Sequence, residues 1–293
     1  MNRITFILAF VLAFPFLGNA QRKRAFMVGI SNYHSNGYKV WNNIHGAEDV
    51  ALLKPELEKK GFKMQMLTNE QATYQGILHT LDNFIAASNK GDVIYMHFSC
   101  HGQPVEDGLN GMAKDEKDGW DESIVPIDAG NEYNSIYKGE KHITDDELNG
   151  YISKLRMKIG PKGMLYVVLD ACHIGEASRI GLETVRGSSE ALTSNPNCEY
   201  KPSKSNIKHY SLEKVEGMAP ALFVEACMSY QRNTEIRIDG KEYGALSYNI
   251  YQALKGMNSL DSTTKEQFKG NIYASIKEKG RWPRNPQDIV MEE

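Results

Sequence analysis

The chain has 293 residues, of which 41% are hydrophobic and 24% charged, and its formal net charge at pH 7 is -3. This length and apolar content suffice for one large domain or two small ones with a hydrophobic core, without disulfide staples. A mildly acidic chain with no long block of like charge gains no counterion-release affinity for phosphate, so nucleic acid is excluded as an expected partner.

The first twenty residues form a segment of their own. A single early positive charge, Arg3, precedes an apolar stretch (4–17), and the small residues Gly18 and Ala20 follow. This pattern is typical of a secretory signal peptide, and we expect cleavage after Ala20, so that the mature protein begins near Gln21. The apolar stretch is short and contains a proline, which disfavours a spanning helix. The sequence therefore predicts an exported protein, periplasmic or secreted, with no stable membrane span.

Strand-like and helix-like segments alternate along the rest of the chain. Apolar runs predict strands at 24–30, 63–68, 92–99, 164–169 and 221–228. Apolar residues at helical spacing predict helices at 46–62 (kinked at Pro55), 73–87, 145–155, 243–256 and 264–280. Continuous apolar strands separated by amphipathic helices predict an α/β fold, namely a three-layer α/β/α sandwich with a mostly parallel central sheet. The polar stretch 176–220 has no sustained period and is expected to be a functional loop.

Two of the predicted strands end in a Cys-His pair. The first pair lies in FSCHG (98–102) and the second in LDACH (169–173). Because ligands bind at the carboxyl edge of a parallel sheet, both pairs are expected at the binding edge. A thiol next to an imidazole and a helix N-terminus can act as a nucleophile, and backbone N–H groups at a glycine turn can bind an oxyanion. From the residues alone, which Cys works with which His stays open.

The two stretches resemble the signature motifs of the caspase-like cysteine peptidases, specifically the metacaspase branch of peptidase family C14 in clan CD. The resemblance implies that His101 is the general base and Cys172 the nucleophile. It also implies that the N–H groups of Cys172 and Gly102 form the oxyanion hole. The Gln-Ala-Cys-x-Gly signature of caspases themselves is absent, which favours the metacaspase-like branch over Asp-cleaving caspases.

The resemblance extends over about residues 24–256. It includes the stretches 29–53, 118–128 with 143–148, and 221–236 with 243–254. It implies one caspase-like peptidase domain (21–293), composed of a large-subunit-like part (about 21–186), the polar loop (about 176–220) and a small-subunit-like part (about 220–293).

The family likeness also implies the substrate class, which is protein or peptide with Arg or Lys at P1, the residue whose carbonyl is attacked. The matching S1 pocket positions are Asp49, Ser99 and Asp170. Carboxylates that converge on one cleft favour a cationic side chain, and Arg can bind them bidentately. Alternatively, Asp49 offsets the dipole of its helix, Asp170 caps a local turn, and Ser99 only fills the strand end.

Calcium is the one metal that the resemblance suggests. The chemistry needs no cofactor, but metacaspases of this type often need Ca²⁺ as an activator, and the matching acids are Asp121, Asp145 and Asp146. The TDDE sequence (144–147) is also a helix capping box, which explains these acids without a metal. The fourth family ligand falls at Arg179, a cation, so the site is incomplete or differently built.

An Arg-specific or Lys-specific peptidase can cleave its own loop. TVRGSS (184–189) places Arg186 among small polar residues, and we predict autoprocessing there; the basic run 21–24 is a second, weaker candidate.

Two other interpretations stay open. Cys100, His101, Cys172 and His173 are donors that zinc accepts, although adjacent strand residues point to opposite faces. A catalytically inactive caspase-like domain used for binding or signalling is the other. A disulfide between Cys198 and Cys227 is also left undecided by the sequence.

Overall fold

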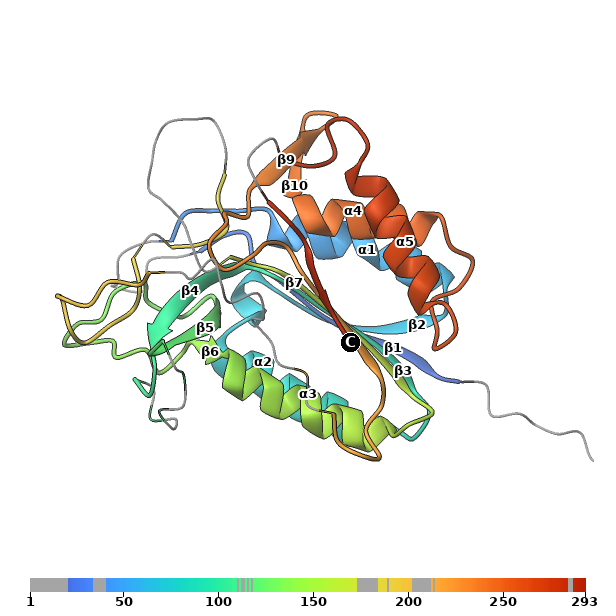
Figure 1. Ribbon diagram of the computed structural model, residues 1–293, viewed down its shortest axis with the longest axis horizontal. Coiled ribbons are helices and arrows are strands. Elements are labelled where there is room, and N and C mark those ends of the chain that lie inside the picture. Colours follow the sequence, from blue (N-terminus) through green and yellow to red (C-terminus); the bar gives the residue numbers. More distant parts are fainter. Residues whose placement is uncertain are drawn as a thin grey trace, which may run out of the picture.

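A six-stranded sheet runs through the middle of the molecule, with helices on both of its faces (Figure 1). The computed structural model describes residues 21–33, 41–109, 111, 114, 116, 118–172, 184–188, 190–201, 212, 214–283 and 287–293. Within these residues, no helix combines the length and the apolar character needed to cross a membrane.

The order of the strands confirms the predicted parallel sheet. Across the sheet they are β11 (Val290–Glu292), β8 (Ala221–Glu225), β7 (Met164–Asp170), β3 (Val93–Ser99), β1 (Lys23–Gly29) and β2 (Phe62–Thr68). All neighbours pair in parallel except β11, which runs antiparallel to β8 at one edge. The chain leaves β1 for β2 on one side and then crosses to β3 on the other, which opens a crevice at the carboxyl ends of β1 and β3.

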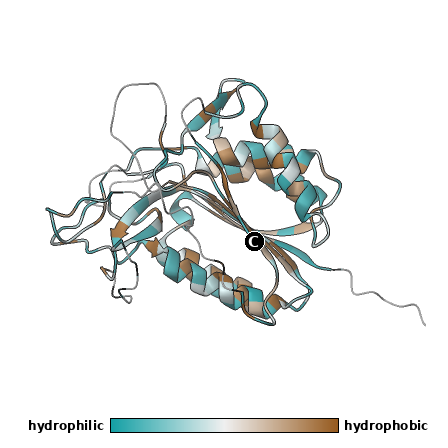
Figure 2. Ribbon diagram, in the orientation of Figure 1, coloured by the Kyte–Doolittle hydropathy of each residue, from teal (hydrophilic) through white to brown (hydrophobic). Residues whose placement is uncertain are grey.

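Helices cover both faces of the sheet, as predicted. One face carries α1 (Gly46–Lys59), α4 (Ala245–Lys255) and α5 (Lys265–Ile276); the other carries α2 (Tyr74–Ala86) and α3 (Asp145–Ile159). Strand residues alternate between the two cores: Ala25 and Met27 of β1 face the first group, and Phe26 and Val28 the second. Figure 2 shows hydrophobic and hydrophilic residues alternating along the helices, as expected when one side is buried.

Smaller elements that were not predicted frame the carboxyl edge. They are the three-stranded sheet of β4 (His101–Glu106), β5 (Trp120–Val125) and β6 (Ile143–Thr144), the hairpin of β9 (Glu235–Ile238) and β10 (Lys241–Gly244), and the short 3₁₀ turn η1 (Asn69–Gln71). The hairpin turns at Asp239 and Gly240, both with positive φ (49° and 82°). An Asp-Gly pair is the turn that this geometry favours, so the sequence did contain a hairpin signal.

Several predicted boundaries shift. The first helix stays continuous through Pro55 and ends at Lys59, α3 continues to Ile159, and α5 ends at Ile276. The strand predicted to reach residue 228 ends at Glu225, where the chain leaves the sheet beside β7.

Candidate active site

Neighbouring strands deliver the two predicted catalytic residues to one edge. β3 and β7 pair in parallel with Ser99 opposite Asp170, so both end at the same level of the sheet. His101 follows two residues after Ser99 and opens β4, and Cys172 follows two residues after Asp170. The fold therefore brings the two strand ends together, as the sequence predicted.

The imidazole of His101 is held in one orientation by its surroundings. Its Nε2 lies 2.7 Å from the carbonyl oxygen of Asn42, which can only accept, so Nε2 carries the proton and Nδ1 the lone pair. Trp41 stacks on the ring at 5.0 Å between centroids, and the hydroxyl of Tyr33 accepts the His101 backbone N–H at 3.0 Å. Nδ1 is buried and has no hydrogen-bond partner among the described residues. Burial lowers the pKa of His101 to about 4, so the ring is neutral and able to accept a proton.

Two backbone N–H groups converge on one carbonyl oxygen of the chain itself. The N–H of Cys172 donates to the carbonyl oxygen of Arg186 at 3.0 Å, and the N–H of Gly102 donates to the same oxygen at 3.4 Å. These are the two groups predicted to form the oxyanion hole. The thiol of Cys172 donates to the carbonyl of Gln231 at 3.1 Å. The sulfur must therefore leave that hydrogen bond and lose its proton before it can attack.

The segment around Arg186 pairs with the chain on both sides of this carbonyl. Upstream, residues 184–186 run antiparallel to 233–235; the Arg186 N–H donates to Asn233 O at 3.0 Å, and the Glu235 N–H donates to Thr184 O at 2.9 Å. Downstream, Gly187 forms a parallel β-bridge with Gly102, and residue 192 forms a second parallel β-bridge with residue 105. The backbone of this segment is thus fixed at the edge of the sheet.

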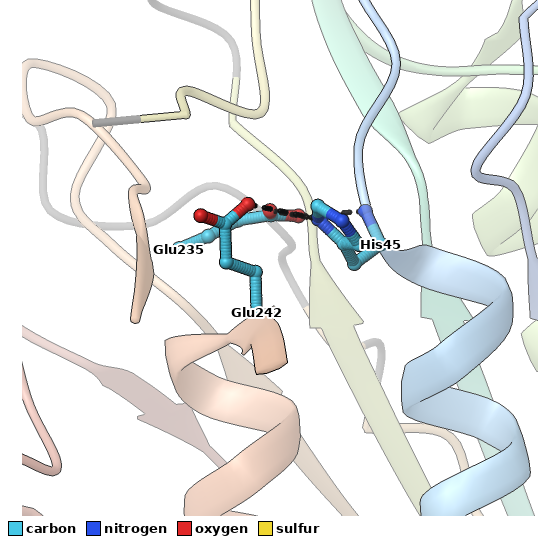
Figure 3. Close-up of side chains that lie close together, drawn as sticks. All are labelled: His45, Glu235 and Glu242. Carbon is cyan, nitrogen blue, oxygen red and sulfur yellow. Dashed lines mark hydrogen bonds and ion pairs between the residues drawn. The ribbon is translucent and has the colours of Figure 1, made fainter. Parts of the chain in front are cut away.

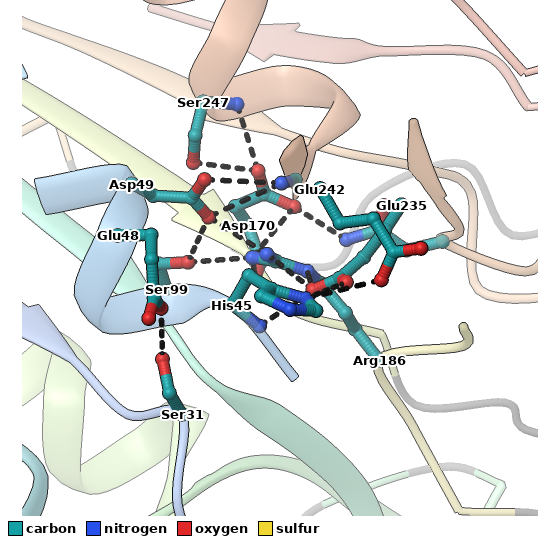
Figure 4. A network of polar contacts seen from close by, with 12 residues as sticks. Ser31, His45, Glu48, Asp49, Ser99, Asp170, Arg186, Glu235, Glu242 and Ser247 are labelled. Atoms are coloured by element: carbon teal, nitrogen blue, oxygen red, sulfur yellow. Dashed lines mark hydrogen bonds and ion pairs between the residues drawn. The ribbon is translucent and has the colours of Figure 1, made fainter. Parts of the chain in front are cut away.

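The guanidinium of Arg186 is completely buried, and acceptors meet all of its N–H groups (Figure 4). Its Nε donates to Glu235 at 3.1 Å, and Nη2 donates to Asp49 and to Glu235, both at 2.7 Å. Its Nη1 donates to the hydroxyl of Ser99 at 2.5 Å and to the carbonyl of Asp170 at 3.4 Å. The five N–H donors of the planar guanidinium are thus all paired with acceptors. The predicted positions Asp49, Ser99 and Asp170 thus do come together around an arginine.

The pocket holds more negative than positive charge, because three carboxylates face one guanidinium. Burial raises the pKa of Asp49 to about 7 even though Arg186 lies beside it. Burial also disfavours the charge on Asp170, but Arg186, Asn233 and Ser247 together lower the pKa of Asp170 below its ordinary value. Neither acid plays only the local role that the alternatives allowed.

The third carboxylate, Glu235, was missed by the sequence prediction. It lies at the start of β9, and its Oε1 also accepts the backbone N–H of His45 at 2.8 Å. Its Oε2 lies 2.5 Å from Nδ1 of His45, and Glu242 lies 3.6 Å from the same nitrogen (Figure 3). Burial opposes a charged His45, but the two glutamates outweigh it and raise the pKa of His45. His45, Glu235 and Glu242 are the one group of three donors within 4.8 Å of one another among the described residues.

Gly244 was also missed, although the pocket depends on it. Its N–H donates to Asp49 at 3.0 Å. A Cβ atom at this position would lie 2.2 Å from Oδ2 of Asp170 and 2.6 Å from Nη1 of Arg186. Only a glycine leaves room for a guanidinium here.

A chain of buried hydrogen bonds fixes Asp170 from behind. Ser247 donates both its N–H (2.7 Å) and its hydroxyl (2.6 Å) to Oδ2 of Asp170. His97 lies 3.0 Å from the Ser247 hydroxyl and 2.9 Å from the Tyr95 hydroxyl. Burial lowers the pKa of His97 to about 4, so this ring is a neutral link in the chain. His97 was not singled out as a site residue from the sequence.

A second group of acids lies at β5 and the start of α3. Asp121 and Asp145 are buried, and Thr144 caps the helix by accepting the Glu147 N–H at 3.4 Å. Oδ1 of Asp145 has no hydrogen-bond partner in the part of the chain that the structure describes. Burial, followed by the charges of Glu122, Asp121, Asp146 and Glu116, raises the pKa of Asp145 well above its ordinary value. The capping alternative therefore accounts for Thr144 but leaves a buried carboxylate oxygen that suits a hard cation. The oxygens of Asp121, Asp145 and Asp146 do not all lie within 4.8 Å of one another.

Other predicted residues have mixed outcomes. All four cysteines are free, with Cys198 exposed and Cys227 buried, so the structure contains no disulfide between these two. Cys100, His101 and Cys172 do not form a group of converging donors in the described part of the chain, which gives the zinc interpretation no support. His173 and Arg179 lie outside the described residues.

Comparisons with known proteins agree with this geometry. The model of a family described as the caspase domain, peptidase family C14, matches residues 22–270. The chain belongs to the caspase-domain family. The prediction of a caspase-like chain is thereby confirmed.

The curated relatives of this caspase-domain chain include fungal metacaspases. It is 26% identical over 234 residues to metacaspase-1A of Neurospora crassa, which covers 76% of this chain and 47% of that protein. It is 31% identical over 167 residues to metacaspase-1B of Aspergillus fumigatus, covering 53% of this chain and 36% of that protein. The chain thus spans about half the length, or less, of the curated relatives it matches.

A solved structure supports the fold. Protein GSU0716 from Geobacter sulfurreducens aligns with a TM-score of 0.59 at 19% identity, over 92% of this caspase-domain chain and 93% of that one. At this identity the likeness speaks for the architecture alone, and it agrees with the α/β caspase-like fold predicted above.

Proposed function

We propose that the protein is a cysteine endopeptidase that cleaves peptide bonds after Arg or Lys. One observation carries this proposal: the carbonyl oxygen of Arg186 accepts from the N–H groups of Cys172 and Gly102 while its side chain fills a pocket of three carboxylates. A carbonyl held this way is polarised for attack, and its side chain is bound by charge. Family membership supports the same reaction class.

The residues divide the reaction as follows. Nδ1 of His101 takes the proton of Cys172, and the thiolate attacks the P1 carbonyl carbon. The two N–H groups stabilise the oxyanion that forms, and His101 then gives the proton to the leaving amine. Water hydrolyses the thioester and releases the enzyme. Thiol and imidazole carry the chemistry, with no cofactor taking part in these steps.

The acceptors around Arg186 favour arginine over lysine at P1. The guanidinium has five N–H donors that meet four acceptor atoms, with Oε1 of Glu235 accepting twice, whereas an ammonium has only three donors on a single nitrogen. A lysine in this pocket would therefore form fewer of these hydrogen bonds than an arginine. We therefore place arginine first and lysine second among substrates.

Cleavage of fluorogenic peptides that differ only at P1 tests the proposal. Peptides with Arg, Lys and Asp are compared, with Cys172→Ala as the inactive control. We expect the order Arg above Lys, and no hydrolysis of the Asp peptide. Hydrolysis of the Asp peptide alone would overturn the specificity and keep the peptidase. A folded protein without activity on any of them would favour the non-catalytic binding domain.

We also propose that the enzyme cleaves itself after Arg186. Support comes from the placement of the bond between Arg186 and Gly187, whose carbonyl lies at the two N–H groups and whose flanks are paired on both sides. Purified wild type, Cys172→Ala and Arg186→Gln are compared on denaturing gels, and the fragments are identified by mass. Fragments that begin at Gly187 in wild type alone are the expected result. The same fragments in Cys172→Ala would point to another protease.

Calcium is proposed as an activator that binds near Asp121, Asp145 and Asp146. The buried Asp145 oxygen without a partner supports it, although the three side chains must draw closer to share one ion. Adding CaCl₂ is expected to raise both the melting temperature and peptide hydrolysis in wild type, and to do neither in Asp145→Asn. An equal response of the variant would remove these residues from the calcium site.

Export is a further proposal, and it rests on the pattern of residues 1–20, which lie outside the described residues. The mass of the protein recovered from the exported fraction of the producing cell tests it. A protein beginning at Gln21 is expected; a full-length protein retained in the cytosol contradicts it.

A further inference from the structure

A second thiol lies beside the nucleophile. Cys227 follows the end of β8 by two residues, as Cys172 follows the end of β7, and these two strands are neighbours in the sheet. Both thiols donate to the carbonyl oxygen of Gln231, Cys172 at 3.1 Å and Cys227 at 3.6 Å. The neighbouring Cys172 thiol, together with burial, raises the pKa of Cys227 well above its ordinary value.

The position of the two residues suits a covalent link. Neighbouring strands lie about 4.8 Å apart, and a disulfide joins Cα atoms about 4.4–6.8 Å apart. In the register of β7 and β8, Leu169 lies opposite Glu225, so Cys172 and Cys227 leave the sheet within one residue of the same level. Both side chains point to one carbonyl, so a bond between the sulfurs needs little movement of the backbone.

We propose that Cys227 is a resolving cysteine, which captures an oxidised Cys172 as a reversible disulfide. The co-reactant is a peroxide. The proposal rests on the proposed function only in taking Cys172 as the thiol that reacts.

The reaction has two balanced steps. The Cys172 thiolate attacks hydrogen peroxide; a sulfur–oxygen bond forms, the oxygen–oxygen bond breaks, and the hydroxide that leaves takes a proton and becomes water. The sulfur is oxidised to a sulfenic acid and the peroxide is reduced. Cys227 then gives up its proton, and its thiolate attacks the Cys172 sulfur; the disulfide forms, the sulfur–oxygen bond breaks, and the hydroxide that leaves takes up that proton and becomes water.

Cys227 is suited to the second role. While Cys172 is a thiol beside it, the raised pKa of Cys227 keeps Cys227 protonated, so it does not compete with Cys172 for the peroxide in the first step. Without it, a sulfenic acid on Cys172 can be oxidised further to a sulfinic acid, which a thiol reductant does not reverse. The neighbouring thiol thus converts an irreversible loss of the nucleophile into a reversible one.

The remaining cysteines provide matched controls. Cys198 is exposed, whereas both cysteines of the pair are buried. Cys100 is buried in the sheet edge, and burial raises the pKa of Cys100 to about 12, which keeps it unreactive. Cys198→Ser therefore makes the same chemical change as Cys227→Ser but leaves Cys172 and Cys227 intact, so it is the matched control.

The experiment treats purified wild type, Cys227→Ser and Cys198→Ser with hydrogen peroxide, and then with dithiothreitol. Intact mass, peptide mapping and hydrolysis of the P1 Arg peptide are followed at each stage. Wild type and Cys198→Ser are expected to lose two hydrogen atoms, to show a peptide linked between 172 and 227, and to regain full activity on reduction. Cys227→Ser is expected to be as active before treatment, to gain two oxygen atoms on Cys172, and to stay inactive after reduction.

Two results would overturn the proposal. One is a wild type that gains oxygen on Cys172 with no linked peptide, and the other is a Cys227→Ser variant that recovers as fully as wild type. The linked peptide is measured by mass alone, so it decides the matter even if the substituted protein fails to fold. It also separates this proposal from the peptidase proposal, because mapping needs no turnover.

Discussion

Two groups of buried carboxylates lie at the carboxyl edge of this fold, and they differ in one respect. Around the proposed S1 pocket, Asp49, Asp170 and Glu235 surround the guanidinium of Arg186. At the start of α3, Asp145 faces further acids, and one of its oxygens has no hydrogen-bond partner. The first group contains a cation supplied by the chain, and the second has no basic partner for Asp145 in the described structure.

The difference shows how each group contributes to stability. Buried carboxylates are costly unless a cation or N–H groups compensate them. The carboxylates of the proposed S1 pocket have their guanidinium partner only while the segment 184–188 stays bound, so the same contacts that stabilise the intact chain also fill its pocket. In the α3 group, burial and the neighbouring acids disfavour the charged form of Asp145, so a bound cation is expected to stabilise it. One group is therefore expected to release its cation on activation, and the other to take one up.

The largest expected effect comes from removing the cation of the S1 group. In a Cys172→Ala background, Arg186→Gln leaves three buried carboxylates without their partner, and we expect the free energy of unfolding to fall by about 3–5 kcal/mol. Arg186→Lys keeps the positive charge but loses the planar guanidinium, so the free energy of unfolding should fall less than in Arg186→Gln. Urea unfolding measures both. Arg237→Gln, on an exposed residue of β9, is the control and should change stability by no more than about 0.5 kcal/mol.

Narrowing the same pocket should strongly weaken substrate binding without removing a charge. Gly244→Ala places a methyl group against Asp170 and the guanidinium, and kcat/KM for P1 Arg peptides should fall by about 10²-fold or more. Gly270→Ala, in α5 with nothing within 4 Å of the added Cβ, is the matched control and should retain activity. Equal activity of the two variants would show that P1 arginine binds elsewhere.

The charge of Asp49 should appear in the pH profile. With a cation beside it, Asp49 has a pKa of about 7, and an empty pocket loses the lowering effect of Arg186, so the free enzyme titrates at that value or above. Cation binding needs the ionised form, so kcat/KM for P1 Arg should fall about 10-fold per pH unit below this range. The pKa of His101, about 4, lies too low to explain such a limb. If the fall of kcat/KM at acidic pH persists in a folded Asp49→Asn variant, the titration belongs to another group.

The smallest expected effect has the opposite sign and belongs to the α3 group. The folded pKa of Asp145 is above its unfolded value, so its contribution to stability is present at low pH and is lost as pH rises through the folded pKa. At neutral pH without calcium, Asp145→Asn should therefore raise the free energy of unfolding by about 1 kcal/mol. Thermal unfolding in the presence of a chelator measures this. Destabilisation by Asp145→Asn under these conditions would mean that the group is already compensated.

The sequence predicted the parts of this fold that depend on local pattern. The apolar runs that became β3 and β7 were located to within a residue, because a strand buried on both faces has a continuous apolar sequence. β4 and β5 were missed because polar residues such as Gln103 and Glu122 interrupt any period. The β9–β10 hairpin had a readable turn at Asp239 and Gly240 that was overlooked.

The site was predictable where motifs exist and not where only the fold creates it. Asp49, Ser99 and Asp170 came from the family resemblance and do meet at one guanidinium. Glu235 belongs to the same pocket only because a strand far along the chain lies beside the start of α1, where His45 holds it. Gly244 is needed because a Cβ atom there would collide with side chains from distant parts of the chain, and no sequence periodicity indicates such a contact.

The position of the Arg186–Gly187 bond determines what remains after it is cut. One product would contain β1, β2, β3 and β7, and the other β8 and β11, which are hydrogen-bonded across the middle of one sheet. The halves would therefore travel together in gel filtration and separate only under denaturing conditions. Each half alone would present a bare apolar strand edge, which invites aggregation, so a clipped molecule that unfolds is not expected to reassemble. After cleavage, the native structure would therefore depend on two fragments staying associated.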